Sequence, residues 1–395
     1  MAKNTKPAIR FKGFTDAWEQ RKLGDVFEEY SEKGHEELPA LTIIQGGGTI
    51  RRDSSDRSLQ YDKASLSNYK KVEAGDFIVH LRSFEGGLEM ATDLGIISPA
   101  YHTFHGEGTD SRFYYSYFRS SKFINQDLKP HVYGIRDGRS IDIQGMKTIE
   151  IPWSSFDEQK AIGDYIENLD RLITLHQRKY DSLVNVKKAM LEKMFPKNGE
   201  TVPEIRFKGF TDAWEQRKVG ELIEDYIEKT IVQNQYPVLT SSQQQGIVFQ
   251  EEYFADRQVT TNDNIGYYVL PYGYFTYRSR SDTDIFVFNR NTLINKGIIS
   301  YYYPVFYPKK CNSNFLLRRL NYGIRKQLSM AAEGTGQKVL AHNKFKNMVV
   351  DVPKLNEQER IGSLFSNLDN LITLHQRKLE KLKNIKKSCL EKMFV

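Results

Sequence analysis

The chain contains the same segment twice, and this duplication limits its possible folds more than any other feature. Residues 9–22 and 205–218 both read IRFKGFTDAWEQRK. Residues 158–195 and 357–394 form a second related pair, since both contain LITLHQRK and both end in LEKMF. Each half is therefore built as a leader, a variable region and a tail. The repeat is far longer than the roughly 20–50 residues of a solenoid, so two copies of one fold in a pseudo-two-fold arrangement are expected.

The two tails have the pattern of long helices. Apolar residues recur at alternating three- and four-residue spacing from Ile162 to Met190 and from Ile361 to Met393, as in a coiled coil. His176 and His375 hold equivalent places in this apolar stripe, and we interpret them as hydrogen-bonded residues that fix the register rather than as a catalytic pair. The two helices are predicted to pair antiparallel, with the globular regions at opposite ends of a rod.

Capping signals accompany both tails. Asn356 is predicted to cap the second helix, with Glu359 completing a capping box, and Asp157 is predicted to cap the first. Pro196, followed by Lys-Asn-Gly, predicts the end of the first helix.

The variable regions, at about 23–155 and 219–355, have the short apolar stretches and Gly, Asn and Asp turns of β-rich domains. LPALT in the first region corresponds to YPVLT in the second, and GIIS occurs in both. We therefore predict an α+β chain in which one fold carries two different surfaces. The predicted division is 1–155 and 201–355 for the β-rich domains, with 156–200 and 356–395 for the helices.

Composition excludes several classes of protein. The net charge of +7 and a pI near 9 favour an anionic partner, most commonly nucleic acid. No run of residues approaches the ~18 consecutive apolar residues of a membrane span. The N-terminus lacks the apolar core of a secretory signal. Cys311 and Cys389 are too few and too isolated for a disulfide framework or a zinc ribbon, so a reducing, cytoplasmic location is expected.

Familiar catalytic motifs are missing from the sequence. No proline is followed by proline or aspartate, which excludes the Asn/Asp-Pro-Pro-aromatic motif of methyltransferases and the usual Pro-Asp nuclease signature. There is no P-loop, G-x-S-x-G or H-E-x-x-H. His102 and His105 lack a third ligand, so a solvated loop is favoured over a metal site. Trp18 and Trp214, in the repeated leader, are interpreted as core anchors rather than base-stacking residues.

The leader RF-x-GF…W-E-x-R-K-[LV]-G, the tail E-Q-x-x-I-G…N-L-D-x-L-I and the ending K-M-F each occur twice. In this arrangement the chain closely resembles the specificity subunits of type I restriction-modification systems. The resemblance implies two target-recognition domains, each reading one half of a bipartite, asymmetric DNA site, and a coiled coil that sets the gap between the halves. It implies no catalysis by this chain and no catalytic, metal or cofactor site on it.

The partners that the resemblance implies are double-stranded DNA, two modification subunits and two restriction subunits, with no membrane. The modification subunits would use S-adenosylmethionine to methylate adenine N6. The restriction subunits would use ATP and Mg for translocation and cleavage.

Base edges are read by Arg, Lys, Asn, Gln, Ser or Thr presented from loops. The DNA-binding candidates of the first half are Gln45, Thr49, Arg51, Arg52, Arg82, Ser83, Tyr133, Arg136 and Arg139. Those of the second half are Ser241, Ser242, Gln243, Gln244, Arg278, Arg280, Gln337 and Lys338. Arg82 and Arg278 follow matching strands, which favours a shared phosphate contact for both. Two alternatives stay open: a duplicated coiled-coil scaffold that binds protein or glycan, and a stand-alone restriction-type enzyme with a diverged active site.

Overall fold

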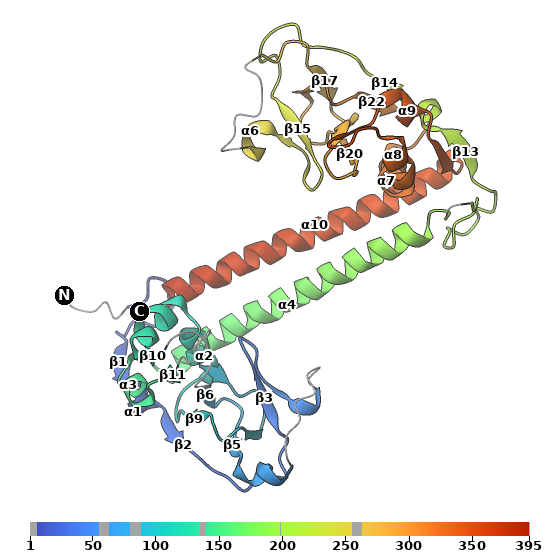
Figure 1. Cartoon of the computed structure of the whole chain (residues 1–395). Coiled ribbons are helices and arrows are strands. Elements are labelled where there is room, and N and C mark those ends of the chain that lie inside the picture. Colours follow the sequence, from blue (N-terminus) through green and yellow to red (C-terminus); the bar gives the residue numbers. More distant parts are fainter. Residues whose placement is uncertain are drawn as a thin grey trace. The chain divides into compact units, whose positions relative to one another are not determined.

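The computed structural model describes residues 6–54, 63–79, 88–134, 140–197, 199–254 and 263–394. The chain divides into two compact units, one of Met1–Arg178 with Gln376–Val395 and one of Lys179–His375. Each unit contains one β-rich region, part of the first long helix and part of the second. Figure 1 follows the chain through these elements.

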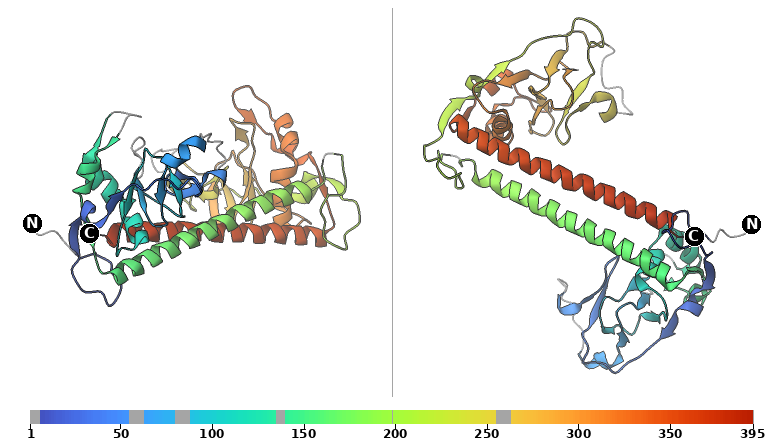
Figure 2. Two further views of the ribbon diagram at one scale, coloured as in Figure 1. Left: turned by 90° about the horizontal axis from the view of Figure 1, so that it is seen from below. Right: turned by 180° about the vertical axis from the view of Figure 1, so that it is seen from behind.

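The long helices are α4 (Phe156–Lys193) and α10 (Leu355–Lys392), each of 38 residues. The first unit contains the start of α4 and the end of α10, joined by an ion pair of 2.5 Å between Asp170 and Lys386. In the second unit, Lys187 of α4 contacts Asp369 of α10 at 2.6 Å. Within each unit the two helices therefore lie side by side and run antiparallel, as Figures 1 and 2 show. The predicted antiparallel helix pair is confirmed.

The predicted helix caps are wrong. Asn356 lies inside the first turn of α10, and the amides of Glu357 and Gln358 bond to the carbonyl of Lys354 instead. Likewise, α4 begins at Phe156, before Asp157. Both helices begin earlier than predicted because their first backbone hydrogen bonds go to the carbonyls of Ser155 and Lys354, which precede the predicted caps.

The first unit is built on a four-stranded antiparallel sheet. Its strands are, in spatial order, β2 (Glu28–Tyr30), β9 (His102–His105), β6 (Phe77–Val79) and β7 (Glu89–Met90). The two-stranded pairs are β1 (Glu19–Lys22) with β12 (Glu150–Trp153), β3 (Leu41–Ile44) with β4 (Gly48–Arg51), β5 (Lys70–Val72) with β8 (Gly95–Ile97), and β10 (Val132–Tyr133) with β11 (Ser140–Ile141). The short helices are α1 (Leu23–Val26), α2 (Ser111–Phe118) and α3 (Ile143–Lys147), with 3₁₀ turns at Arg52–Ser54, Lys63–Asn68 and Lys129–His131 and a π-helical turn at Phe123–Leu128.

The second unit repeats this topology. Its four-stranded sheet has the order β14 (Ile223–Asp225), β22 (Val305–Pro308), β18 (Phe275–Tyr277) and β20 (Phe288–Arg290). The two-stranded pairs are β13 (Glu215–Lys218) with β24 (Val349–Val352), β15 (Leu239–Ser242) with β16 (Gly246–Phe249), β17 (Tyr268–Pro271) with β21 (Lys296–Ile299), and β19 (Arg280–Ser281) with β23 (Lys338–Val339). The helices are α5 (Val219–Leu222), α6 (Gln250–Tyr253), α7 (Ser313–Gly323), α8 (Arg325–Ala331) and α9 (His342–Lys346). The two variable regions therefore share one sheet order despite their different sequences.

Each hydrophobic core joins a leader to the end of a long helix. Trp18, 2% exposed, packs edge-on against Phe113 and lies 6.5 Å, ring to ring, from Phe394 at the end of α10. Trp214, also 2% exposed, packs in the same way against Phe195, which follows α4. The interpretation of both tryptophans as core anchors is confirmed. The repeated K-M-F ending thus supplies a buried aromatic ring to each core.

The backbone repeats the same junction in both units. The amide of Ile9 donates to the carbonyl of Lys392 at 3.0 Å in the first unit. The amide of Ile205 donates to the carbonyl of Lys193 at 2.9 Å in the second. In both places the leader begins against the last turn of a long helix. Across the described residues, we find no helix that combines the length and apolar character needed to span a membrane.

Candidate nucleic-acid interface

A buried carboxylate attaches each leader to the first turn of a long helix. Glu158 is 1% exposed and accepts two hydrogen bonds from Arg10, at 2.5 and 2.7 Å, and a third from the Trp18 indole at 2.9 Å. Glu357 repeats the two-point contact with Arg206, at 2.7 Å for both bonds. These hydrogen bonds raise the pKa of both arginines, so both guanidinium groups stay charged at neutral pH.

The next residue of the tail attaches the β-rich domain to the same helix turn. Gln159 accepts from the amide of Asp110, the N-cap of α2, at 3.0 Å and donates to a backbone carbonyl beside the helix start. Gln358 accepts from the amide of Asn312, the N-cap of α7, at 2.9 Å. A Cβ on Gly362 would lie 2.6 Å from the Asn312 side chain, so a glycine is needed for this approach. The repeated E-Q-x-x-I-G segment therefore fixes how each domain sits on its helix.

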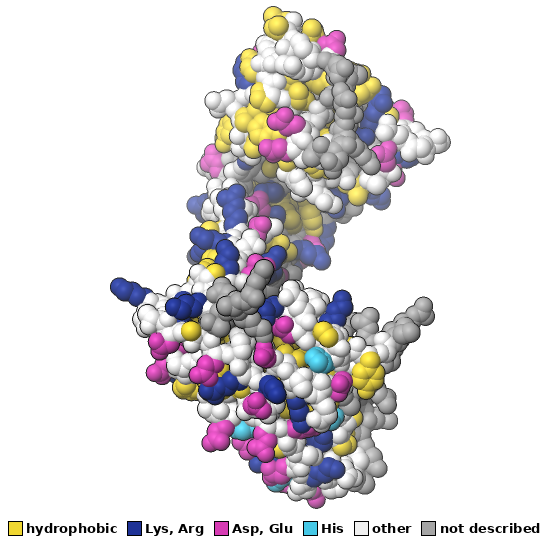
Figure 3. Space-filling view, turned by 90° about the vertical axis from the view of Figure 1, so that its left-hand side faces the viewer, with side chains coloured by type: hydrophobic (Ala, Val, Ile, Leu, Met, Phe, Trp, Pro, Cys, Tyr) yellow, Lys and Arg dark blue, Asp and Glu magenta, His cyan; other side chains and the backbone are white. Residues whose placement is uncertain are grey.

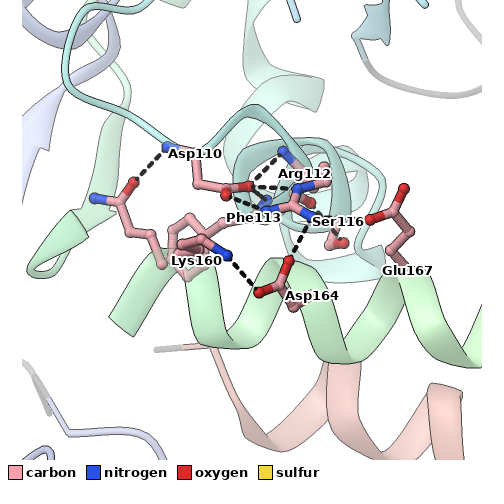
Figure 4. Close-up of polar contacts among 8 residues, drawn as sticks. Asp110, Arg112, Phe113, Ser116, Lys160, Asp164 and Glu167 are labelled. Atoms are coloured by element: carbon pink, nitrogen blue, oxygen red, sulfur yellow. Dashed lines mark hydrogen bonds and ion pairs between the residues drawn. The ribbon is translucent and has the colours of Figure 1, made fainter. Parts of the chain in front are cut away.

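Charged side chains reinforce this attachment in the first unit (Figure 4). Arg112 on α2 bonds Asp110 at 2.6 Å and reaches Asp164 and Glu167 on α4 at 2.5 and 2.8 Å. Lys160 contacts Asp164 as well, at 2.8 Å. The hydrogen bonds from Lys160 and Arg112 hold the pKa of Asp164 below its usual value. A domain fixed in this way to a helix presents its loops in a defined direction.

The β3–β4 hairpin carries three of the predicted DNA-binding residues of the first half, and a fourth directly follows it. Gln45 lies exposed at the tip, and Arg51 lies exposed on β4, where it contacts Asp93 at 3.2 Å. Arg52 follows β4 and donates to the Tyr69 hydroxyl.

Thr49 does not fit its predicted role. It is 3% exposed and its hydroxyl contacts Thr92 at 3.1 Å. The Thr49 hydroxyl also accepts from the amide of Thr92 at 3.0 Å, so the side chain is held against the segment that follows β7. Thr49 therefore supports the hairpin from within.

Of the other predicted residues of the first half, the structure describes only Tyr133. Arg82, Ser83, Arg136 and Arg139 lie outside the described residues. Tyr133, on β10, is 61% exposed. Its ring is therefore available to a partner.

A buried glutamate that sequence reasoning missed holds the tip of the first hairpin. Glu89 on β7 accepts from the amides of Gly46 and Gly48, at 2.7 and 3.3 Å, and from Tyr115 and Arg119. Burial and the neighbouring carboxylate raise the pKa of Tyr115, which keeps its hydroxyl protonated and donating. The backbone amides of both glycines are thus hydrogen-bond donors to Glu89. Gln45, which precedes Gly46, stays exposed at the tip.

In the second unit the predicted residues gather around one cleft of about 370 Å³. Its walls include Ser241, Ser242, Gln243, Gln244, Arg278 and Arg280. The first four come from the β15–β16 hairpin, the counterpart of β3–β4, and the arginines come from the chain that follows β18. Ser242 is buried and its hydroxyl accepts from the amide of Gln244 at 3.2 Å, so it shapes the turn.

The last two candidates border this cleft. Gln337 donates to Asp282 at 3.0 Å, and Asp282 also lies 3.8 Å from the Arg278 guanidinium. Lys338 lies on β23 and pairs with Ser281 of β19. Residues separated by almost a hundred positions in the chain therefore meet at one polar surface.

The side chain that holds the hairpin is a carboxylate in the first unit and an amide in the second. Asn289 on β20 pairs with the central strand as Glu89 does on β7. Its amide donates to the hydroxyl of Ser241 and to the carbonyl of Ser242, at 2.8 Å in both cases. In the first unit the Glu89 carboxylate accepts hydrogen bonds from glycine amides of the hairpin, whereas in the second unit the Asn289 amide donates to serine oxygens. The same scaffold can therefore present different residues at the same place.

Charges of both signs are mixed on the face of the first unit that Figure 3 shows, where lysine and arginine side chains are interspersed with acidic ones (lower part of the figure). His102 contacts Glu29 at 2.5 Å and His105 contacts Asp76 at 2.7 Å, so each of the two histidines has its own carboxylate. Across the residues that the structure describes, no group of three or more His, Cys, Asp or Glu side chains could hold a metal ion. Local loop chemistry, rather than overall charge, marks the candidate interface.

Comparison with known proteins gives the class. Residues 211–384 match the family model of the type I restriction modification DNA specificity domain. Over 314 residues the chain is 24% identical to the type I restriction enzyme MjaVIII specificity subunit of Methanocaldococcus jannaschii, which covers 71% of this chain and 68% of that protein. The resemblance predicted from the leader and the tail is thus confirmed, and residues 211–384 match the DNA specificity domain family. In particular, the protein that this chain resembles is the specificity subunit of a type I restriction-modification system.

One solved structure shows the same fold. The type I restriction-modification system S subunit from M. genitalium matches with a TM-score of 0.55 and 15% identity, over 99% of each chain. The HsdS subunit from Thermoanaerobacter tengcongensis matches with a TM-score of 0.45 and 17% identity, over 95% of this chain and 96% of that one. The α+β fold predicted from the duplication is confirmed by the M. genitalium match.

Proposed function

We propose that this specificity subunit recognises a bipartite, asymmetric DNA sequence. Residues 1–155 and 201–355 are the two target-recognition domains, and residues 156–200 and 356–395 form the helical spacer. Each domain reads one half-site through its hairpin and the residues around it. The observation that carries the proposal is the pair of equivalent hairpins, β3–β4 and β15–β16, which share one fold but carry different polar side chains.

The spacer helps to explain why two domains are useful. Each mismatched base pair typically costs about 1–3 kcal/mol, so two coupled domains multiply the discrimination of one. The buried Glu158 and Glu357 contacts fix each domain to its helix, which supports a coupling without a flexible linker.

The proposal extends to partner subunits. Leu172 and Leu175 on α4 are at least 40% exposed, and so are Leu371 and Leu374 on α10. Large exposed apolar side chains on a helix favour protein docking. We propose that they contact two modification subunits, which methylate adenine N6 with S-adenosylmethionine, and that two ATP-dependent restriction subunits join the complex. In this proposal the chain recognises the DNA sequence, acts in the cytoplasm and catalyses no step.

The test is a map of N6-methyladenine in cells that express this chain with its modification subunit. Removing the chain should abolish methylation at one bipartite motif. The double variant Gln45→Ala with Arg51→Ala should alter only one half of the motif, and Gln243→Ala with Gln244→Ala should alter only the other. Each variant is the control for the other. An unchanged methylation map in cells that lack the chain would exclude this function and favour a scaffold.

A further inference from the structure

The two arginines that line the cleft of the second unit differ in their surroundings. Arg278 lies 3.8 Å from the carboxylate of Asp282, which also accepts a hydrogen bond from Gln337. Arg280 lies with its guanidinium carbon 4.1 Å from the centroid of the Tyr302 ring. Within the described part of the chain, the Arg280 guanidinium has no hydrogen bond or ion pair. Resting on the proposed function, we infer that Arg280 reads a guanine in the half-site bound by the second domain.

Tyr302 is itself held in place beneath Arg280. The carbonyl of Tyr302 accepts two bonds from Ser279, one from the amide at 3.1 Å and one from the hydroxyl at 2.7 Å. The Tyr302 hydroxyl accepts from the Tyr301 hydroxyl at 3.1 Å. Ser279 is the residue before Arg280, so the platform and the arginine are tied together. The guanidinium is consequently ordered before DNA arrives, and less side-chain entropy is lost on binding.

The strand that carries Arg280 is also fixed. Arg280 pairs with Val339 in the β19–β23 ladder. The carbonyl of Ser279 accepts from the amide of Leu340, which is buried in the core. Ser281 is buried, and its hydroxyl accepts from the amides of Thr283 and Ile285, both at 3.2 Å. Backbone on both sides of Arg280 is therefore anchored, while its side chain lines the cleft.

The geometry selects guanine on chemical grounds. Stacking on Tyr302 occupies a face of the guanidinium and leaves the N–H donors, which lie in its plane, for another partner. In the major groove, guanine alone presents two acceptors, O6 and N7, that a fork of donors can reach together. Adenine pairs one acceptor with a donor, and cytosine offers a donor. Arg278 shares its guanidinium with Asp282, so fewer of its donors are free for a two-point contact with a base. We keep for Arg278 the phosphate contact that its position directly after β18 predicts.

The test measures competition binding of the full chain, with its modification subunit, to duplexes in which each position of the second half-site is changed in turn. In Arg280→Ala, discrimination in favour of guanine should fall by about 5- to 150-fold at one position, with the other positions unchanged. Arg280→Lys keeps the charge but loses the fork, so it should lose discrimination while keeping the salt dependence of binding. If Arg280→Ala does not fold, Arg280→Lys decides the question.

Arg278→Ala is the matched control, because it removes the same charge from the same cleft. It should weaken binding to all duplexes alike and keep the preference for guanine. The inference is overturned if Arg280→Ala weakens all duplexes alike, if it changes nothing, or if Arg278→Ala is the variant that loses the preference. A wild-type chain without any sequence preference would instead refute the proposed function, and with it this inference.

Discussion

Replacing Gly362 by alanine tests the attachment of the second domain to its helix. In an ordinary helix interior, alanine would stabilise relative to glycine by about 1 kcal/mol. Here the new Cβ would lie 2.6 Å from the Asn312 side-chain oxygen, 2.9 Å from the Cβ of Asn314 and 3.0 Å from the amide nitrogen of Phe315. The Asn314 Cβ and the Phe315 nitrogen are fixed by the backbone of α7, so a change of side-chain rotamer cannot remove these two contacts.

The expected magnitude follows from three contributions. Overpacking typically costs about 1–3 kcal/mol. Asn312 caps α7 through the amide of Phe315, and displacing that cap costs about 1 kcal/mol. After subtracting the gain in helix propensity, Gly362→Ala should lower the free energy of unfolding by about 2 kcal/mol. For a unit of this size the melting temperature should fall by roughly 4–8 °C.

Differential scanning calorimetry of the full chain measures this change. Ser363→Ala is the control, because Ser363 is the exposed neighbour on the same helix and should gain a few tenths of a kcal/mol or show no change. If Gly362→Ala raised the melting temperature as much as an ordinary glycine-to-alanine change, the close approach of α7 to α10 would be disproved.

Three further predictions concern hydrogen-bonded polar side chains. Glu158→Gln should destabilise the first unit by roughly 2–4 kcal/mol, and Glu357→Gln should cost the second unit about 1 kcal/mol less, because only Glu158 bonds a tryptophan indole; calorimetry that gave the reverse order would contradict this. Asn289→Asp should weaken binding of the second half-site on the order of 10-fold in duplex competition, since a carboxylate cannot donate to the Ser242 carbonyl; an equal loss at the first half-site would be unexpected. Burial raises the pKa of Asp225, but hydrogen bonds led by Lys346 outweigh it and leave the pKa lowered, so the stability from this group is present at neutral pH and is lost as pH falls below about 4. Asp225→Asn should flatten that acid dependence in a series of melts at different pH, and an unchanged profile would refute the linkage.

The sequence predicted the fold well because the duplication and the helix periodicity are strong, independent signals. The apolar stripe from Ile162 and the one from Ile361 led to two long helices, and both are present. The starts of the helices were wrong because their first backbone hydrogen bonds go to Ser155 and Lys354, before the predicted caps. The burial of Glu357 depends on Arg206, which lies about 150 residues away in the chain, and no local pattern reveals such a partner.

The hairpin candidates show the same limit at the site. Runs of glycine, serine and glutamine predicted the two loops, and both are hairpin tips. No local pattern excluded Thr49, because its burial comes with contacts to Thr92, which lies 43 residues further along the chain. Glu89 and Asn289 had no signal of their own, because their roles arise only when β7 and β20 pair beside the hairpins. The meeting of Arg280 and Tyr302 is likewise a product of the fold.

Because the same contact joins a leader to the end of a long helix in both units, the fold does not depend strongly on which half of the chain comes first. In the second unit, Lys193 and Ile205 meet across a short connecting segment, whereas in the first unit the same contact joins Lys392 to Ile9. A circularly permuted gene that joins the region after Lys392 to the region before Ile9, and opens the chain between Lys193 and Ile205, would keep both contacts. Tolerance of permutation is expected where termini lie close together at such a surface. We therefore expect the chain to fold with its two halves synthesised in either order.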